Sequence, residues 1–514
     1  MTSETRVVVI GGGMAGARLA QQLAPAPGTA VTVLGEESHA PYNRVLLAEV
    51  LAGRYGPDVI ALPSPGPALR RGVRAVRVDR ADRVVQCDDG SVVGYDTLVL
   101  ATGSNPVLPP LRGLGRELPS GVHPFRTMDD CVALSAAASP GTRAVVIGGG
   151  LLGVSAARAL AERGAQVVLA HQGEHLMERQ LDPAASALLR THLEGLGVEV
   201  HAECRVRGLR CAPPVGGAGA GAASPTGARF GTPLSGTGLA PGTGLAPGTG
   251  LGAGAALGVP ARSGAPGSGA DRRHATRPGA GVGPRSGTPG VEAGNAARAA
   301  GAPASGAGVV SAVELADGYA LDAELVVLAC GVRPRTGLAQ AAGLDVRRGI
   351  VVDDELRTSD PYIRAIGDCA EHAGKLYGLA GPALEQADVL ARLLTAGEAS
   401  ARYAGTRALT RLTLAHPGQG PRPGQDTHAG PGPLDLAAFG ETTPLPGDDV
   451  LHLADATRST YRKVVVRGDR LVGGVLLGDL GTVGALARTW EGDEPLLDSP
   501  ANPLLHLLTN DGGS

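Results

Sequence analysis

Residues 6–16, Arg-Val-Val-Val-Ile-Gly-Gly-Gly-Met-Ala-Gly, decide the fold class of this 514-residue chain. The apolar residues at the start predict a short β-strand, and residues 17–23 continue with the spacing of a helix. The glycines in between have the G-x-G-x-x-G spacing of a dinucleotide-binding turn in its strand–turn–helix context. Gly11 permits the tight turn, Gly13 lets the backbone approach a pyrophosphate, and Gly16 lets the helix pack closely on the strand.

The helix after these glycines and a second strand complete the first predicted site. The helix N-terminus, with Met14 and Ala15 in its first turn, offers free N–H groups and a dipole that favour an anion. The apolar strand at residues 30–35 ends in Glu36 and Glu37, about 20 residues after the glycines, where an acid is expected to meet the ribose hydroxyls. We therefore interpret this unit as a Rossmann-type module that binds a dinucleotide.

The same pattern returns further along the chain. Residues 143–147 predict another apolar strand, Gly148, Gly150 and Gly153 repeat the glycine fingerprint, and residues 154–163 predict a helix. Two complete fingerprints in one chain are far more specific than either alone. They imply two bound dinucleotides, one of which we expect to be a flavin.

The second strand of this later unit, residues 166–170, ends in His171 instead of an acid. An acid at this place selects NAD through the ribose 2′-hydroxyl, whereas a positive group favours the 2′-phosphate of NADP. Histidine decides neither, and His171 could equally be an ordinary surface residue.

Charge and cysteine content argue against several other classes of function. The formal net charge is only −3, which does not favour a nucleic-acid or anionic-membrane partner. The start of the chain has no signal-peptide pattern, and no apolar stretch reaches the roughly 18 residues that a membrane span needs. The 6 cysteines form no Cys-x-x-Cys pair, so we expect structural thiols in a reducing cytoplasm and no metal site.

Two tracts are too poor in large apolar residues to form a core. Residues 211–308 and 416–433 are rich in Gly, Ala, Pro, Ser and Thr, and we predict both to be disordered. Strand-like sequence flanks the longer tract, so we place it as a neutral insertion in a loop between strands of one domain. Without both tracts roughly 400 residues remain, which fits two nucleotide-binding domains and a small third domain.

The C-terminal region predicts that third domain. Residues 461–466 and 471–479 predict a strand pair, with Asp469 in the turn between them. Lys463, which with Lys375 makes up all the lysines of the chain, is expected to be a solvated residue on its strand.

Further segments match the motifs of a known family. They are residues 34–47, 98–103 (Leu-Val-Leu-Ala-Thr-Gly), 125–130 (Phe-Arg-Thr-Met-Asp-Asp), 175–182 (His-Leu-Met-Glu-Arg-Gln-Leu-Asp), 330–334 (Cys-Gly-Val-Arg-Pro), 365–370 (Ala-Ile-Gly-Asp-Cys-Ala) and 382–386. With both fingerprints, they make the chain resemble the FAD- and NAD(P)H-dependent pyridine nucleotide-disulfide oxidoreductase superfamily. Within it, the chain is most similar to the flavin-binding half of assimilatory nitrite reductase large subunits and to electron-transfer subunits of assimilatory nitrate reductase.

The resemblance implies an α/β fold with two Rossmann-like dinucleotide-binding domains, glutathione-reductase-like, plus a small C-terminal α/β domain and the long disordered insertion. The FAD-binding domain would comprise residues 1–115 and 333–408. The NAD(P)-binding domain would comprise residues 116–332, and the C-terminal domain residues 409–514.

The resemblance also implies which residues bind FAD and NAD(P)H. Glu36 and Glu37 would hold the adenosine ribose of FAD, Arg44 would reach the FAD, and Asp368 would bind the ribityl chain. The predicted FAD set is Gly11, Gly13, Met14, Ala15, Gly16, Glu36, Glu37, Arg44, Ala101, Thr102, Gly103, Arg126, Gly367 and Asp368. The predicted NAD(P) set is Gly148, Gly150, Gly153, Ser155, His171 and Gly331. We name no catalytic acid or base, because the flavin itself carries hydride transfer.

Departures from the family limit what the resemblance implies. Residues 40–50 contain no cysteine, so we expect no thiol relay beside the flavin. Glu49 stands where ferredoxin and rubredoxin reductases often have lysine, and Ser155 stands where many relatives have a glutamate that places the nicotinamide ribose. No cysteine follows Cys369, so the chain is expected to hold no cysteine-ligated cluster and to be unable to reduce nitrite alone.

The first functional hypothesis is an FAD-dependent NAD(P)H oxidoreductase that passes electrons to a separate nitrate or nitrite reductase component. The second is a reductase of the same fold for an iron–sulfur carrier such as a ferredoxin or rubredoxin, or for an oxygenase, with Arg126 and the pair Arg70–Arg71 as candidate docking residues. The third is a flavin-binding regulatory protein with little turnover, because a fold alone does not establish activity. The choice between NADH and NADPH, and the formation of a homodimer, stay open.

Overall fold

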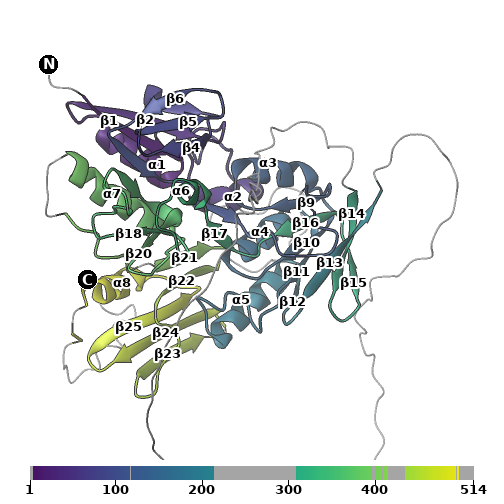
Figure 1. Ribbon diagram of the computed structural model, residues 1–514. Helices are drawn as coiled ribbons and strands as arrows, with labels where there is room; N and C mark the ends of the chain where they lie inside the picture. Colours follow the sequence, from purple (N-terminus) through teal and green to yellow (C-terminus); the bar gives the residue numbers. More distant parts are fainter. Residues whose placement is uncertain are drawn as a thin grey trace, which may run out of the picture. The chain divides into compact units, whose positions relative to one another are not determined.

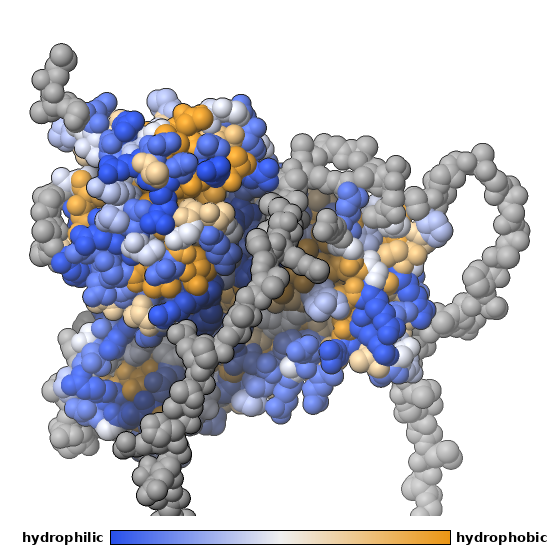
Figure 2. All heavy atoms as spheres, viewed as in Figure 1, coloured by the Kyte–Doolittle hydropathy of each residue, from blue (hydrophilic) through white to orange (hydrophobic). Residues whose placement is uncertain are grey.

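A computed structural model of the chain describes residues 4–115, 117–213, 308–395, 401–407, 409–414, 434–455, 457–493 and 495–496. The predicted tract 416–433, and residues 214–307 of the predicted tract 211–308, lie outside the described residues. Among the described helices, none is both long enough and apolar enough to cross a membrane. The face shown in Figure 2 is mainly hydrophilic, with hydrophobic patches between the polar residues.

The first fingerprint belongs to a five-stranded parallel sheet with the order β19-β7-β1-β2-β3. Figure 1 labels β1 and β2 of this sheet and the helix α1. The strand β1 is buried from Val7 to Ile10, as expected for a parallel sheet with both faces covered. A strand from much later in the sequence, β19, completes the sheet, and helices α1 and α7 pack on each other. The elements are β1 (Thr5–Ile10), α1 (Met14–Leu23), β2 (Thr29–Gly35), β3 (Leu69–Arg71), β7 (Thr97–Leu100), β19 (Ile363–Ala365) and α7 (Ala380–Thr395).

Several short elements belong to the same parts of the sequence as this sheet, and one of them, α2, packs on α3 (Met128–Ala137) and α4 (Leu151–Glu162). They are η1 (Arg44–Leu46), α2 (Leu47–Leu51), η2 (Gly66–Ala68), an antiparallel sheet of β4 (Ala75–Asp79), β5 (Val84–Cys87) and β6 (Val92–Gly94), the helices α6 (Gly337–Ala341) and η3 (Gly367–Cys369), and the parallel pair β18 (Ile350–Val352) and β20 (Ala370–His372). The strands β8 (Ser104–Pro106) and β17 (Val332–Pro334) form an antiparallel pair. In sequence, β8 lies where the chain leaves the first sheet, and β17 lies where the chain returns toward it.

The second fingerprint belongs to another five-stranded parallel sheet, with the order β12-β11-β10-β16-β9. Its elements are β9 (Val122–Pro124), α3 (Met128–Ala137), β10 (Arg143–Ile147), α4 (Leu151–Glu162), β11 (Gln166–Ala170), α5 (Pro183–Gly195), β12 (Val198–His201) and β16 (Leu325–Leu328). An antiparallel sheet of β13 (Val206–Ala212), β14 (Val309–Leu315) and β15 (Ala320–Asp322) lies between β12 and β16 in sequence.

The predicted insertion starts and ends on paired strands. Ala212, the last residue of β13, pairs with Val309, the first residue of β14. The strand β13 therefore takes in Cys211 and Ala212, two residues that we had assigned to the tract. Because the two ends are hydrogen-bonded neighbours, the domain closes across the insertion.

The C-terminal sheet is antiparallel, with the order β21-β22-β25-β24-β23. Its elements are β21 (Leu409–Thr413), β22 (Asp435–Gly440), β23 (Asp449–Asp455), β24 (Thr460–Arg467), β25 (Arg470–Leu477) and the helix α8 (Val483–Gly492). One face packs on α8, where the rings of Phe439 and Trp490 lie 5.2 Å apart. The predicted turn at Asp469 is present, between β24 and β25.

The prediction for Lys463 is wrong. Its residue exposure is only 9%, and it lies on β24 two positions from buried Tyr461. Side chains two apart on a strand share a face, so the alternation of β24 directs Lys463 inward with Tyr461. There the ammonium group donates to Asp182 at 2.7 Å.

Candidate functional site

On the side that faces the rest of the protein, the first glycine turn is packed so closely that it leaves no room for a Cβ atom. Gly11 has φ +118°, and a Cβ there would lie 2.1 Å from the carbonyl oxygen of Ala101, the residue that follows β7. A Cβ on Gly16 would lie 2.0 Å from the carbonyl oxygen of Gly11. Both positions therefore require glycine for packing within the protein.

The same turn is open at Gly13, which precedes α1. The nearest atom to a Cβ built there is Arg44 Nε at 4.0 Å, and no side chain caps the helix. The N–H groups of Met14 and Ala15 at the start of α1 are thus available to an anion. This cradle fits the pyrophosphate of FAD.

The second turn repeats this construction. Gly148 has φ +113°, and its Cβ would lie 2.4 Å from the carbonyl oxygen of Ala329, while a Cβ on Gly153 would lie 1.7 Å from that of Gly148. Gly150 has no atom within 4 Å of such a Cβ and caps α4 without a side-chain bond. Gly331, with φ +95°, also faces open space. The second turn is therefore closed toward the protein and open toward a ligand in the same way as the first.

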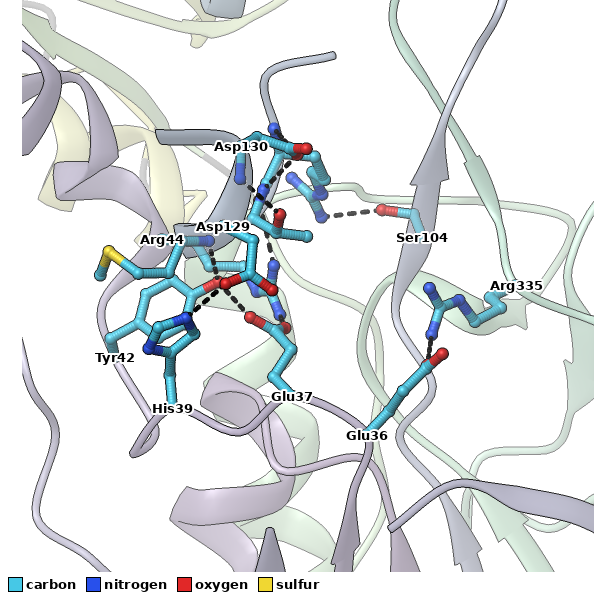
Figure 3. A network of polar contacts seen from close by, with 12 residues as sticks. Glu36, Glu37, His39, Tyr42, Arg44, Ser104, Asp129, Asp130 and Arg335 are labelled. Atoms are coloured by element: carbon cyan, nitrogen blue, oxygen red, sulfur yellow. Dashed lines mark hydrogen bonds and ion pairs between the residues drawn. The ribbon is translucent and has the colours of Figure 1, made fainter. Parts of the chain in front are cut away.

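Predicted flavin residues meet in one polar network (Figure 3). Arg44 pairs with Glu37 and donates from Nη1 to the Arg126 carbonyl oxygen at 3.0 Å. Tyr42, which the sequence prediction missed, donates its hydroxyl to Glu37 at 2.7 Å, and burial raises its pKa. Burial works to lower the pKa of Arg44, but Glu37, Tyr42 and Asp368 together outweigh it and the pKa is raised.

Arg126 and Asp368 form the second half of this network. Arg126 Nη2 donates to Asp368 at 2.5 Å and to the Ser104 hydroxyl at 2.7 Å, and that hydroxyl donates to Asp368 at 2.8 Å. Burial lowers the pKa of Arg126 although Asp368 opposes this shift, and its Nε is buried without a partner. The side chain of Arg126 is only 17% exposed and is bonded within the protein, which does not favour the docking role suggested for it.

Gly367 explains how Asp368 reaches the first turn. Its N–H donates to the buried side chain of Gln386 at 2.7 Å, and a Cβ on Gly367 would lie 3.4 Å from that of Ala15. The motif around residue 367 thus lies against the start of α1, close to the pyrophosphate cradle.

Glu36 has a partner that the sequence did not reveal. It pairs with Arg335, whose Nε donates to the Asn105 side chain at 2.6 Å, and Thr102 donates to the Arg335 carbonyl oxygen at 2.7 Å. Gly103 accepts from the Arg335 N–H at 2.9 Å. The one sequence feature that could have predicted Arg335 as a site residue is its position directly after the motif at residues 330–334.

His171 holds the second glycine turn through a hydrogen bond with its backbone. Its Nδ1 accepts from the N–H of Gly149 at 3.1 Å, and its Nε2 faces the His175 carbonyl oxygen at 3.1 Å. Because Nδ1 accepts from Gly149, the ring N–H that faces the His175 carbonyl oxygen is the one on Nε2. Ser155 is buried, and its hydroxyl donates within α4 to the carbonyl oxygen of Leu151 at 2.8 Å.

Glu49 takes part in a buried ionic network. It pairs with Arg158 of α4, whose exposure is 1%. Arg158 also donates to Glu162 at 3.3 Å, and Arg54 donates to Glu49 at 3.2 Å and to Glu162 at 2.7 Å. Two arginines and two glutamates thus neutralise one another between α2 and α4. The spacing of Arg158 and Glu162 could be read from the sequence, but the partner in α2 could not.

The cysteines lack the properties of a redox relay. All six are free, and burial raises the pKa of both Cys131 and Cys330 to about 11. Burial also raises the pKa of Cys369. A thiolate is the reactive form, so these groups are almost wholly protonated near neutral pH.

We expect alkylation with iodoacetamide at about pH 7 to modify the exposed Cys211 first and to leave flavin reduction by NAD(P)H unchanged. Peptide mass mapping alongside the reduction rate checks this. Loss of reduction in step with modification of Cys330 would instead assign a thiol to the reaction.

Two turns of this geometry, with a polar network beside the first, are typical of proteins with two dinucleotide-binding modules. Comparison with known proteins makes the class specific. The chain belongs to the pyridine nucleotide-disulphide oxidoreductase family, whose sequence model matches residues 5–224 and 290–387. By its description, this family comprises oxidoreductases that use a pyridine nucleotide. A second family, the rubredoxin NAD+ reductase C-terminal domain, matches residues 433–489.

The chain is also similar in sequence to individual curated proteins and in fold to a solved structure. The chain is 27% identical to nitrite reductase [NAD(P)H] of Bacillus subtilis, over 99% of this chain and 50% of that protein. It is 28% identical to the assimilatory nitrate reductase electron transfer subunit of the same organism, over 92% of this chain and 48% of that protein. The chain thus spans about half the length of these curated relatives. In fold it is similar to the covalent putidaredoxin reductase–putidaredoxin complex, with a TM-score of 0.68, 20% identity and 98% of both chains covered.

Proposed function

We propose that the chain takes hydride from NAD(P)H at its second module and passes the electrons from FAD at its first module to a separate acceptor. The proposed acceptor is a cytoplasmic assimilatory nitrate or nitrite reductase component. The observation that carries this proposal is the pair of glycine turns with one construction, closed toward the protein and open at Gly13 and Gly150. The names of the relatives that match over nearly the whole chain support the class of acceptor.

The flavin site uses residues from the ends of several strands. We propose that the start of α1 binds the pyrophosphate and that Glu36 and Glu37 bind the adenosine ribose. Asp368, oriented by Arg126 and Ser104, would bind the ribityl chain. Bound FAD supplies the isoalloxazine ring that accepts the hydride. The remaining predicted flavin residues stay part of this proposal, as do the domain bounds given by the resemblance.

The coenzyme site uses the start of α4. Its free N–H groups and Gly150 would bind the pyrophosphate of NAD(P)H, while His171 holds the turn through Gly149. The chain needs no acid or base of its own for hydride transfer, so its contribution is to bind and orient both cofactors.

An anaerobic titration of the purified flavoprotein with NADH and then NADPH tests the proposal. We expect the oxidised flavin bands in the visible spectrum to bleach rapidly with one of the two nucleotides. The reduced protein should then be reoxidised by a nitrate or nitrite reductase catalytic component. A yellow protein that neither nucleotide bleaches would contradict the reductase function and favour a regulatory role.

The second candidate acceptor is an iron–sulfur carrier. The match of residues 433–489 to the rubredoxin reductase C-terminal domain favours it specifically. Reoxidation of the reduced protein by a rubredoxin or a [2Fe–2S] ferredoxin, at least about tenfold faster than by the nitrate or nitrite reductase components, would select this candidate.

A further inference from the structure

The segment from His175 to Asp182 holds the second glycine turn in place. The N–H of Met177 donates to the Gly149 carbonyl oxygen at 2.9 Å, and the Gly149 N–H donates to His171 at 3.1 Å. Both backbone groups of Gly149 are therefore fixed by residues that follow β11. The side chain of Leu176 also packs here, since a Cβ on Gly149 would lie 2.6 Å from it.

The surroundings of this segment force an unfavourable backbone conformation on it. Met177 has φ +53°, in the left-handed region that a bulky residue rarely adopts, and its side chain is buried. Such a conformation persists only where neighbouring structure determines it. Leu176 and Leu181 are buried in the same core as Met177, and that core includes Tyr461 of the C-terminal sheet.

Asp182 anchors the far end of the segment to that sheet. One carboxylate oxygen caps α5 by accepting from the Ala185 N–H at 2.9 Å. The other accepts from the Tyr461 hydroxyl at 2.8 Å and from Lys463 Nζ at 2.7 Å. Burial works to raise the pKa of Asp182, but the hydrogen bonds from Lys463, Ala185 and Tyr461 together outweigh it and the pKa is lowered.

The charges of Asp182 and Lys463 depend on each other. Their side chains are only 12% and 11% exposed, so neither is well solvated by water. Removing one partner of a buried ion pair leaves the other charge uncompensated and makes the local structure rearrange. Met177, whose N–H bonds to Gly149, lies five positions before Asp182, so a rearrangement at Asp182 would reach the contacts at Gly149 through this short segment.

We infer that Lys463 and Tyr461 are positioning residues of the NAD(P)H site, acting through Asp182 and the segment 175–182 on the turn at Gly149. The C-terminal domain thereby helps to set the affinity for the coenzyme. This inference rests on the proposed function, because it takes the second turn as the coenzyme site.

The test is coenzyme binding to the FAD-containing protein with Lys463→Met. Isothermal titration calorimetry with NAD+ and NADP+ measures the Kd without turnover, and stopped-flow reduction gives the limiting rate. We expect the Kd of the preferred coenzyme to rise about tenfold, while the FAD content and the limiting rate of flavin reduction stay within about twofold of wild type. The matched control is Lys375→Met, which removes the other lysine of the chain, an exposed one, and is expected to keep the wild-type Kd.

A second variant keeps the inference testable if Lys463→Met fails to fold. Tyr461→Phe removes only the hydroxyl that donates to Asp182, and we expect the Kd to rise about threefold. A holoprotein of Lys463→Met, or failing that of Tyr461→Phe, with the wild-type Kd would overturn the inference. Failure of the proposed function looks different, because the wild-type flavin would then not be bleached by either nucleotide.

Discussion

Replacing Gly150 with alanine is expected to remove most NAD(P)H-driven flavin reduction while leaving the fold and the bound FAD intact. Gly150 has φ −81° and ψ −175°, a conformation that alanine adopts without strain, and no protein atom lies within 4 Å of the added Cβ. The methyl group would instead occupy the opening through which the backbone must approach the pyrophosphate. We expect kcat/KM for the preferred coenzyme to fall about 100-fold, with an unchanged thermal unfolding temperature.

The matched control for this variant is Gly153→Ala, one turn further along α4. Its Cβ would lie 1.7 Å from the carbonyl oxygen of Gly148, so helix and strand would have to move apart. We expect this variant to unfold at a clearly lower temperature, whatever ligand is present. Steady-state kinetics and thermal unfolding of both variants separate the two roles. A Gly150→Ala protein with wild-type kcat/KM would show that the second turn is not the coenzyme site.

The glycine turns could be predicted because their requirements are local. Gly11 and Gly148 adopt a positive φ. Gly16 and Gly153 lie so close to the carbonyl oxygen of the residue five positions earlier that a Cβ would clash with it. Such constraints act within one strand–turn–helix unit, and they are visible in any sequence that contains the unit.

Ionic partners across the fold could not be predicted in the same way. The sequence indicated that Asp368 and Arg126 belong to the flavin site, but not that they bind each other. Lys463 was misjudged because we considered its charge, whereas the alternation of β24 determined which way it faces. Each of these pairings depends on which element packs on which, and periodicity within one segment carries no information on that.

Arg158→Met is expected to destabilise the protein, by about 3 kcal/mol, because it removes a buried counter-charge of Glu49 and Glu162 and leaves Arg54 to neutralise both. Arg158 is 1% exposed and contacts both Glu49 and Glu162, so no water can replace its guanidinium without opening the packing of α2 and α4. The thermal unfolding midpoint of the FAD-containing protein measures the effect. The control is Arg190→Met, which breaks an exposed pair with Glu194 and should change stability by less than about 0.5 kcal/mol.

The loss of stability caused by Arg158→Met should also depend on pH, and it should become smaller as the pH falls. Burial already raises the pKa of Glu162 in the folded protein, although its arginine partners oppose this shift. Removing Arg158 takes away one opposing charge, so the folded pKa should rise further above the unfolded value. When the pKa of an acid is higher in the folded than in the unfolded protein, its ionisation lowers the free energy of unfolding. This loss is complete above the folded pKa and disappears as the pH falls below the unfolded pKa. The unfolding midpoints of variant and wild type should therefore approach each other between about pH 7 and pH 4. A gap that stays constant or widens over this range would mean that lost packing, and not the uncompensated carboxylate, accounts for the destabilisation.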